Sequence, residues 1–270
     1  MTHANSMEGP LSRGKRIGLG ILGLIIAFLI AGPPDFAPLM VVTAWSSDLD
    51  GGAHKLHIFS RGVGAIVTLA MGLVLILKPA WTIGAAQVAL ATGIAYPVAA
   101  LLGQFVWPPA VIYPVVGLIV VAVVYLTHRD RLPWKMPADS RPAPSLILLG
   151  VTAIIAIPLI GYGLSEAALQ RGPEAVHGDL GHWAGATAMS VKFIVLGLFA
   201  SLKWPGWRVP AWGAAFTLFM FGVASVLMPN QASSVGEGWG ALAIVASVAF
   251  AGAAELEGRL FARPAAQPAA

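Results

Sequence analysis

Long apolar stretches, separated by short polar segments, dominate the sequence. Eight of them reach or approach the length of about 20 residues that a helix needs to cross a bilayer. They are Ile17–Ala31, Phe59–Leu77, Trp81–Val106, Ala110–Leu126, Leu146–Leu164, Trp183–Leu202, Pro210–Met228 and Gly238–Glu255. The pattern predicts an all-α integral membrane protein with eight transmembrane helices.

The composition agrees with a chain that lies in lipid. Hydrophobic residues make up 57% of the 270 residues and charged residues only 10%, whereas soluble proteins are about 45–50% apolar and about 25% charged. So few charges cannot cover a surface that faces water, which excludes a soluble globular domain and a disordered chain. The basic residues form no stripe with interleaved aromatic side chains, so nucleic acid is excluded as a partner. The absence of Cys excludes disulfides, thiolate-bound zinc, iron–sulfur clusters and a cysteine nucleophile.

The distribution of Lys and Arg along the chain predicts how the spans are oriented. If the N-terminus is cytoplasmic, twelve Lys and Arg residues lie in cytoplasmic segments, and only Lys55, Arg61 and Arg171 lie in outer segments. The outer segments carry acidic residues instead, among them Asp48 and Glu174. We therefore predict a multi-pass protein of the plasma (inner) membrane with both termini in the cytoplasm, which requires an even number of spans.

The second and sixth apolar stretches match one another at an offset of 125 residues. Each opens with a histidine and continues with the motif Gly-Leu-x-x-x-Leu-Lys, at His57 and Gly72–Lys78 in one and at His182 and Gly197–Lys203 in the other. We therefore expect two tandem four-helix repeats, related by a pseudo-two-fold axis along the membrane normal. The repeats would span residues 15–127 and 146–258, with a cytoplasmic linker at residues 128–145 and disordered cytoplasmic tails at residues 1–14 and 259–270.

Histidines gather on the predicted outer side, in segments that also carry acidic residues. Imidazole and carboxylate groups bind zinc, copper and iron. The candidate metal ligands are His54, His57, His177 and His182. The pseudo-two-fold axis could bring His57 and His182 together, where they could hold a transition metal or a haem. The same histidines could instead bind an organic ligand, transfer protons or only cap helices.

Lys192 stands alone among apolar residues, ten positions after His182. That is about 15 Å along a helix, near the middle of the bilayer, where a charged side chain costs from about 3 to more than 10 kcal/mol. The amine therefore snorkels to the interface, loses its proton or faces a hydrated cavity that holds an anion. An ionisable group at this depth is a candidate ligand-binding residue.

Three further residues complete the candidate ligand-binding set, namely Arg61, Asp179 and Gln104. Arg61 would lie on the same helix stripe as the histidines that open the second span. Asp179 could instead cap the sixth span by accepting backbone N–H bonds. Gln104 and Gln87 lie within the third predicted span, where a hydrogen bond between helices is the commoner role of an amide.

These features suggest three kinds of function. The first is a transporter or permease, in which an outward-facing cavity lined by His and Asp lies above Lys192 and handles a small molecule or ion. The second is a membrane enzyme or redox subunit that binds a metal or haem through the outer histidines and acts on a lipid or quinone. The third is a structural or assembly subunit without chemistry. Besides the lipid bilayer and a small molecule or ion, we expect a second copy of the chain or another membrane subunit as partner.

Overall fold

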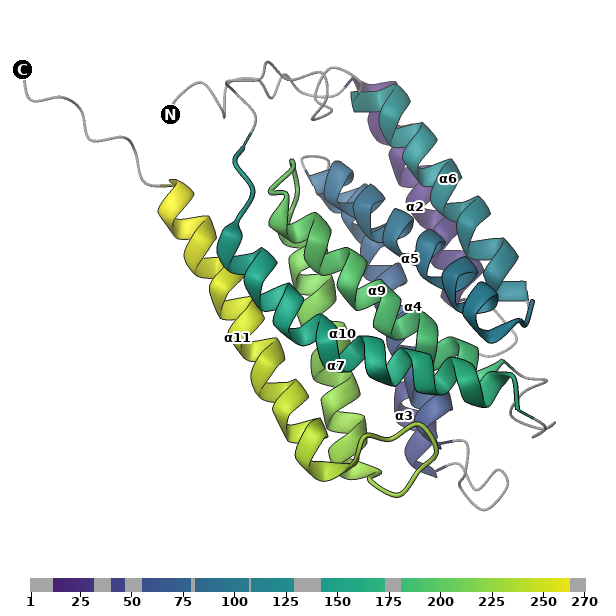
Figure 1. Ribbon diagram of the computed structural model, residues 1–270. Helices are drawn as coiled ribbons and strands as arrows, with labels where there is room; N and C mark the ends of the chain where they lie inside the picture. Colours follow the sequence, from purple (N-terminus) through teal and green to yellow (C-terminus); the bar gives the residue numbers. More distant parts are fainter. Residues whose placement is uncertain are drawn as a thin grey trace, which may run out of the picture.

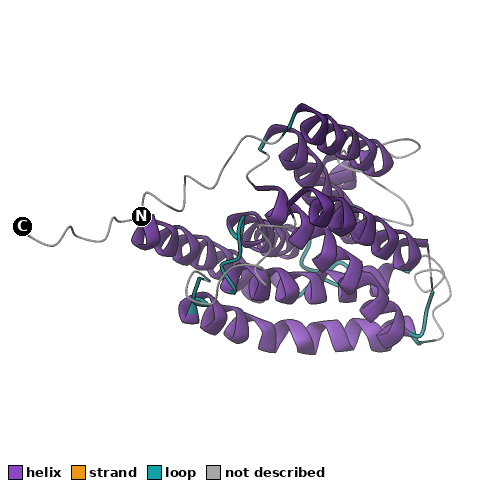
Figure 2. Ribbon diagram, turned by 90° about the horizontal axis from the view of Figure 1, so that it is seen from above, coloured by secondary structure: helices purple, strands orange, loops and turns teal. Residues whose placement is uncertain are grey.

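Helices make up the described part of the chain. The computed structural model describes residues 12–31, 40–46, 55–78, 81–106, 108–128, 142–172 and 181–262, which contain helices and no strand (Figure 1, Figure 2). In chain order the helices are α2 (Arg13–Ala31), α3 (Met40–Ser46), α4 (Lys55–Leu77), α5 (Thr82–Gly103), α6 (Pro108–His128), α7 (Leu146–Gln170), α9 (His182–Ser201), α10 (Arg208–Leu227) and α11 (Gly236–Ala262).

Each predicted span coincides with one long helix. Seven of these helices, from α4 to α11, are long and apolar enough to cross a membrane. Helix α2 opens with Arg13, Lys15 and Arg16 and is not one of the seven, so the eighth span stays a prediction. The described helices confirm an all-α, multi-pass membrane protein that lies in a lipid bilayer.

Four helices form the centre of the bundle. Helices α4, α5, α9 and α10 each pack against the other three, and 50% to 61% of their most apolar stretches is buried. Helices α6, α7 and α11 bury only 22% to 28% of theirs. Figure 1 shows α11 at one edge of the bundle and α2 with α6 at the opposite edge. A polar group that is shielded from lipid is therefore expected among the four central helices.

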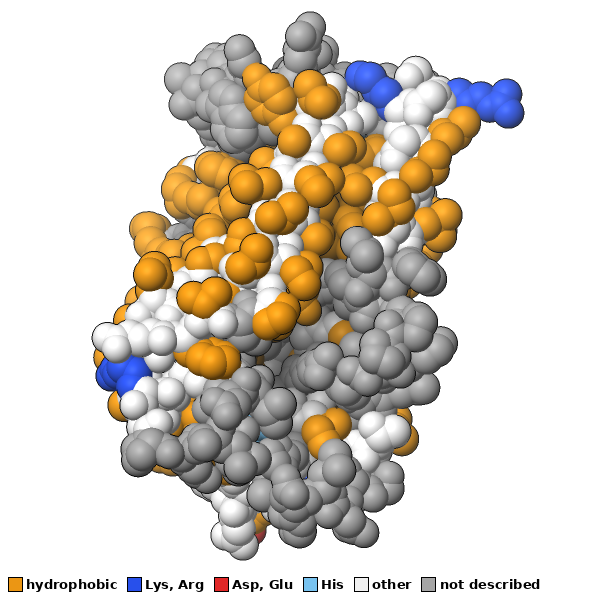
Figure 3. Space-filling view, turned by 90° about the vertical axis from the view of Figure 1, so that its right-hand side faces the viewer, with side chains coloured by type: hydrophobic (Ala, Val, Ile, Leu, Met, Phe, Trp, Pro, Cys, Tyr) orange, Lys and Arg blue, Asp and Glu red, His pale blue; other side chains and the backbone are white. Residues whose placement is uncertain are grey.

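The outer helices present apolar side chains to their surroundings. Leu118 and Leu126 of α6 are 64% and 72% exposed, and Ile154 and Ile157 of α7 are 70% and 73% exposed. Figure 3 shows a face whose middle is covered by hydrophobic side chains, with Lys and Arg side chains towards its margins. Acyl chains offer no hydrogen bonds, so an apolar belt of this kind is what the bilayer requires.

Glycines lie where neighbouring helices cross most closely. A Cβ atom added to Gly23 of α2 would stand 2.5 Å from the carbonyl oxygen of Gly72 in α4. One added to Gly197 of α9 would stand 2.6 Å from Cγ2 of Thr152 in α7. Helices in lipid gain little from the hydrophobic effect and associate by close van der Waals packing, which small residues allow. The glycine shared by the two matching apolar stretches therefore lies at a close helix crossing in both cases.

A buried ion pair joins the ends of three helices. Lys203, just past α9, pairs with Glu257 of α11, and both residues are buried. Ser145 donates a hydrogen bond to Oε1 of Glu257 at 2.8 Å and accepts one from the N–H of Leu148 at 3.0 Å, so it also caps the start of α7. A buried ion pair is tolerated only where further hydrogen bonds satisfy it, and Ser145 supplies one.

Replacing Gly222 by Ala should destabilise the contact between α10 and α11. A Cβ atom at this position would stand 2.6 Å from the carbonyl oxygen of Gly240, so the two helices would have to separate. We expect a loss of about 1–3 kcal/mol, the usual cost of overpacking, measured as a lower midpoint of thermal unfolding in detergent. Gly252→Ala is the matched control, because a Cβ atom there meets nothing within 4 Å. Equal midpoints for the two variants would contradict this packing.

Candidate functional site

His57 and His182 stack against each other at the end of the bundle where α4 and α9 begin, called the His end below. His57 lies in the first turn of α4 and His182 is the first residue of α9. Their ring centroids are 4.6 Å apart and their planes differ by 17°. Trp183 meets the His57 ring edge-on at 5.4 Å, and both residues are buried. The packing of α4 against α9 thus brings together side chains that are far apart in the sequence.

The stacked geometry limits what the two histidines can bind. The lone pair of an imidazole nitrogen lies in the plane of the ring, and zinc sits about 2.0–2.1 Å from each nitrogen that ligates it. Nearly parallel rings direct their lone pairs side by side and not towards a common point. The arrangement therefore does not suit one metal ion or one haem held between the two rings. Within the described ranges, no group of three or more His, Asp or Glu residues could hold a metal.

The closeness of the two rings limits the positive charge that the pair can carry. Two positive charges at the 4.6 Å separation of the rings would repel by about 4 kcal/mol at an effective dielectric constant of about 20. Histidine gains and loses its charge near neutral pH. The stacked pair is therefore suited to hold a single positive charge.

The other predicted site residues fall in different places. His54, His177 and Asp179 lie outside the described residues, and so does the side chain of Arg61, whose backbone belongs to α4. Gln104 follows the last residue of α5 in the left-handed conformation, with a φ of 51°, and is exposed. Its backbone N–H closes the last turn of α5. Gln104 thus ends a helix and does not project from the middle of a span.

Lys192 is buried half-way along α9, with only 5% of its surface exposed. None of the described residues forms an ion pair or a hydrogen bond with its amine. The neighbouring hydroxyl groups have other partners, because Thr187 donates to the carbonyl of Gly163 in α7 at 3.1 Å and Ser190 bonds within its own helix. The amine therefore keeps its full capacity to bind an anion.

Gln87 of α5 is the polar residue that departs furthest from its predicted role. The sequence predicts a hydrogen bond between helices, but neither the nitrogen nor the oxygen of its buried amide has a partner in the described part of the chain. A buried polar group without a partner costs about 1–3 kcal/mol. Helix α5 packs against α9, which carries Lys192. Two polar groups without partners thus lie on two helices that touch, which a bound ligand would explain.

Two residues of α7 hold the His end together. Gln170 accepts a hydrogen bond from the N–H of Ala184 at 3.0 Å and so caps α9, whose N-cap position is a glycine without a side chain. Glu166 is buried within α7 and accepts a hydrogen bond from Ser233 in the loop before α11. The charge distribution along the chain places Glu166 on the outer side with the other acidic residues, and no sequence pattern singles out Gln170. Their partners lie on other elements, so no local pattern could have shown these roles.

Known proteins do not explain this arrangement. No protein family matches the sequence, and no curated protein or solved structure is significantly similar to it. The function is therefore inferred from the described side chains alone.

Cysteines that replace His57 and His182 should cross-link. The chain contains no Cys, and the two rings are in contact, so the two thiols would lie within reach of each other. With a protease site inserted between α6 and α7, oxidised His57→Cys/His182→Cys protein should run as one band on a non-reducing gel after cleavage. His57→Cys with Ser201→Cys is the control, because Ser201 lies about 28 Å along α9 from His182. Separation of the halves in both proteins would contradict the contact.

Proposed function

We propose that the protein is a multi-pass transporter of the inner membrane. It would carry a small anion across the membrane along a path between its two halves. The observation that carries the proposal is Lys192, a buried amine at mid-span for which no described residue provides a counter-charge. A charge at that depth costs from about 3 to more than 10 kcal/mol, and an anion beside the amine would offset much of this cost. Ionisable groups inside a membrane mark ion and substrate pathways for this reason.

Two tandem four-helix repeats, at residues 15–127 and 146–258, would account for the arrangement of the helices. The helix pairs of the first half recur in the second: α2 packs on α4 as α7 packs on α9, and α5 packs on α6 as α10 packs on α11. His57 and His182, at equivalent positions of the two halves, meet where α4 contacts α9. This recurrence supports α2 as the first of eight spans. Transporters with internal repeats hold their substrate near mid-membrane at the repeat interface, the depth of Lys192.

The basic residues support an orientation in which the His end faces outward. Arg13, Lys15, Arg16 and Lys203 lie at the opposite end of the bundle, where α2 begins and α9 ends. Cytoplasmic segments carry the excess of Lys and Arg in membrane proteins. In this orientation both termini are cytoplasmic, and the stacked histidines lie at the outer entrance.

The proposed path runs from the stacked histidines past Lys192 to Gln87. The histidine pair can hold one proton at the entrance, and the amine supplies positive charge at mid-span. The amide of Gln87 has two N–H donors and one carbonyl acceptor. A small carboxylate or phosphate matches this combination, because it carries negative charge and several acceptor oxygens. The alternative of a metal or haem enzyme has less support, because the two rings stack and do not converge on a common point.

Replacing Lys192 by Met should abolish anion-driven charge movement. We would record currents from proteoliposomes on a solid-supported membrane after concentration jumps of chloride, phosphate, acetate and succinate. For any anion that responds, we expect Lys192→Met to lower the response about tenfold or more, the equivalent of about 1.4 kcal/mol of binding free energy. Val67→Met is the control, because it puts the same side chain at the matching buried position of the first half. Equal responses of Lys192→Met and the unsubstituted protein would overturn the proposal, as would no response above that of empty liposomes.

Replacing Gln87 by Leu should raise stability and lower transport. Leucine removes the amide that has no partner and fills a similar volume, so we expect the free energy of unfolding to rise by up to about 1–3 kcal/mol, read from the thermal midpoint. The response to the transported anion should fall in the same variant, because the path loses a polar group.

Accessibility to reagents in water gives the control for Gln87. Gln87→Cys should react with a small anionic methanethiosulfonate, whereas Ala95→Cys, at a fully buried position on the same helix, should not. An unreactive cysteine at position 87 together with unchanged transport in Gln87→Leu would remove Gln87 from the path. The proposed role of Lys192 is tested separately, by the currents of the Lys192→Met variant.

A further inference from the structure

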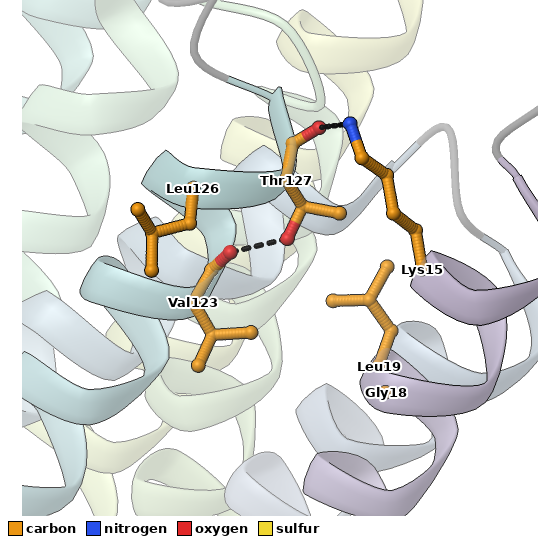
Figure 4. Close-up of a pocket in the computed structure, with 6 residues that line it drawn as sticks. All are labelled: Lys15, Gly18, Leu19, Val123, Leu126 and Thr127. Atoms are coloured by element: carbon orange, nitrogen blue, oxygen red, sulfur yellow. Dashed lines mark hydrogen bonds between the residues drawn. The ribbon is translucent and has the colours of Figure 1, made fainter.

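A shallow groove lies between α2 and α6, at the end of the bundle opposite the His end (Figure 4). It has a volume of about 210 Å³, and its lining residues are Lys15, Gly18 and Leu19 of α2 with Val123, Leu126 and Thr127 of α6. Helix α2 packs mainly against α4 and touches α6 only lightly. The space between α2 and α6 is therefore not filled by either helix.

The walls of the groove are apolar and open to the surroundings. Gly18 contributes no side chain, and a Cβ atom added there would meet nothing within 4 Å. Leu19 is buried behind the groove, whereas Leu126 beside it is 72% exposed. Both helices lie at the edge of the bundle (Figure 1), so the groove faces lipid. An acyl chain is the apolar occupant that these surroundings supply.

Positive charge lies at the mouth of the groove. The ammonium group of Lys15 donates a hydrogen bond across it to the carbonyl oxygen of Thr127 at 3.1 Å, and the hydroxyl of Thr127 turns back to the carbonyl of Val123 (Figure 4). A lysine ammonium has three donors, so two remain for another acceptor. Arg13 and Arg16 are exposed at the same end of α2, and neither α2 nor α6 contains an acidic residue.

We propose that this groove binds one anionic phospholipid, with its phosphate at Lys15 and one acyl chain along Gly18 and Leu126. Charge complementarity favours an anionic lipid, because the three cationic side chains have no acidic partner on either helix. A zwitterionic headgroup is less suitable, because its own cationic group would be repelled by these side chains. Each Lys or Arg near an anionic membrane surface contributes about a fivefold gain in binding. The site lies outside the proposed transport path and depends only on the location of the chain in a bilayer.

Native mass spectrometry of the full chain tests this site. The protein is released from micelles that contain equal amounts of phosphatidylglycerol and phosphatidylcholine with the same acyl chains, and we expect it to retain one phosphatidylglycerol. Lys15→Gln should lower this occupancy about fivefold. Gly18→Leu should lower it as well, because the new side chain fills the groove and leaves every charge in place.

Matched variants separate this groove from a general attraction to lipid. Lys78→Gln removes an exposed lysine elsewhere, and Gly252→Leu adds a side chain to open space on α11, so both should retain the lipid. Lys15→Arg keeps the positive charge and should also retain the lipid. If Gly18→Leu fails to fold, the comparison of Lys15→Gln with Lys15→Arg still tests the site.

Three results would overturn the proposal. One is equal retention of the two lipids by the unsubstituted protein. Another is an equal loss of phosphatidylglycerol in Lys15→Gln and Lys78→Gln, which would indicate only a general charge effect. The third is displacement of the lipid by inorganic phosphate, which would show that the groove recognises a free anion.

Discussion

Close contact between small side chains holds this bundle together, because lipid gives helices no hydrophobic reason to associate. Gly23 meets the backbone of Gly72, and Gly222 meets that of Gly240, at distances that would not admit a Cβ atom. These crossings bring the peripheral helices α2 and α11 close against the central helices α4 and α10. Larger side chains at these crossings would move α2 away from α4 and α11 away from α10, and the second shift would disturb the ion pair that Glu257 of α11 forms.

Some buried polar groups have an ion-pair or hydrogen-bond partner within the protein, and others have none among the described residues. The proposed function rests on the second kind. Lys203 and Glu257 neutralise each other, and Ser145 satisfies a further carboxylate oxygen. Lys192 and Gln87 are as deeply buried, but no described residue pairs with them. A low dielectric environment makes an unpaired group costly, and apolar residues of similar volume would be at least as stable. The proposed role in binding a substrate would explain why such residues occupy the centre of the bundle.

The two ends of the bundle present different chemistry. At the His end two stacked imidazoles lie against a perpendicular indole, and Gln170 of a neighbouring helix caps the start of α9. The opposite end gathers cationic side chains, some paired inside the bundle and others exposed beside the groove of α2 and α6. A ligand that binds only the folded chain stabilises it by mass action. A lipid in this groove would therefore secure α2 against α6 without entering the proposed transport path.

The lengths of the apolar runs determined the class of protein and the places of the seven helices that are long and apolar enough to cross a membrane, because a run of about 20 apolar residues has the length of a bilayer-spanning helix. They also singled out Lys192, because a charged side chain within such an apolar run is costly in lipid and marks a candidate functional residue. Only the tertiary structure decided that α4, α5, α9 and α10 form the centre, that His57 and His182 stack, and that Gln87 has no partner among the described residues. The physical reason is that a side chain facing lipid and one facing another helix are equally apolar, so the sequence pattern does not distinguish them. Polar contacts between helices depend on distances that exist only once the helices have packed.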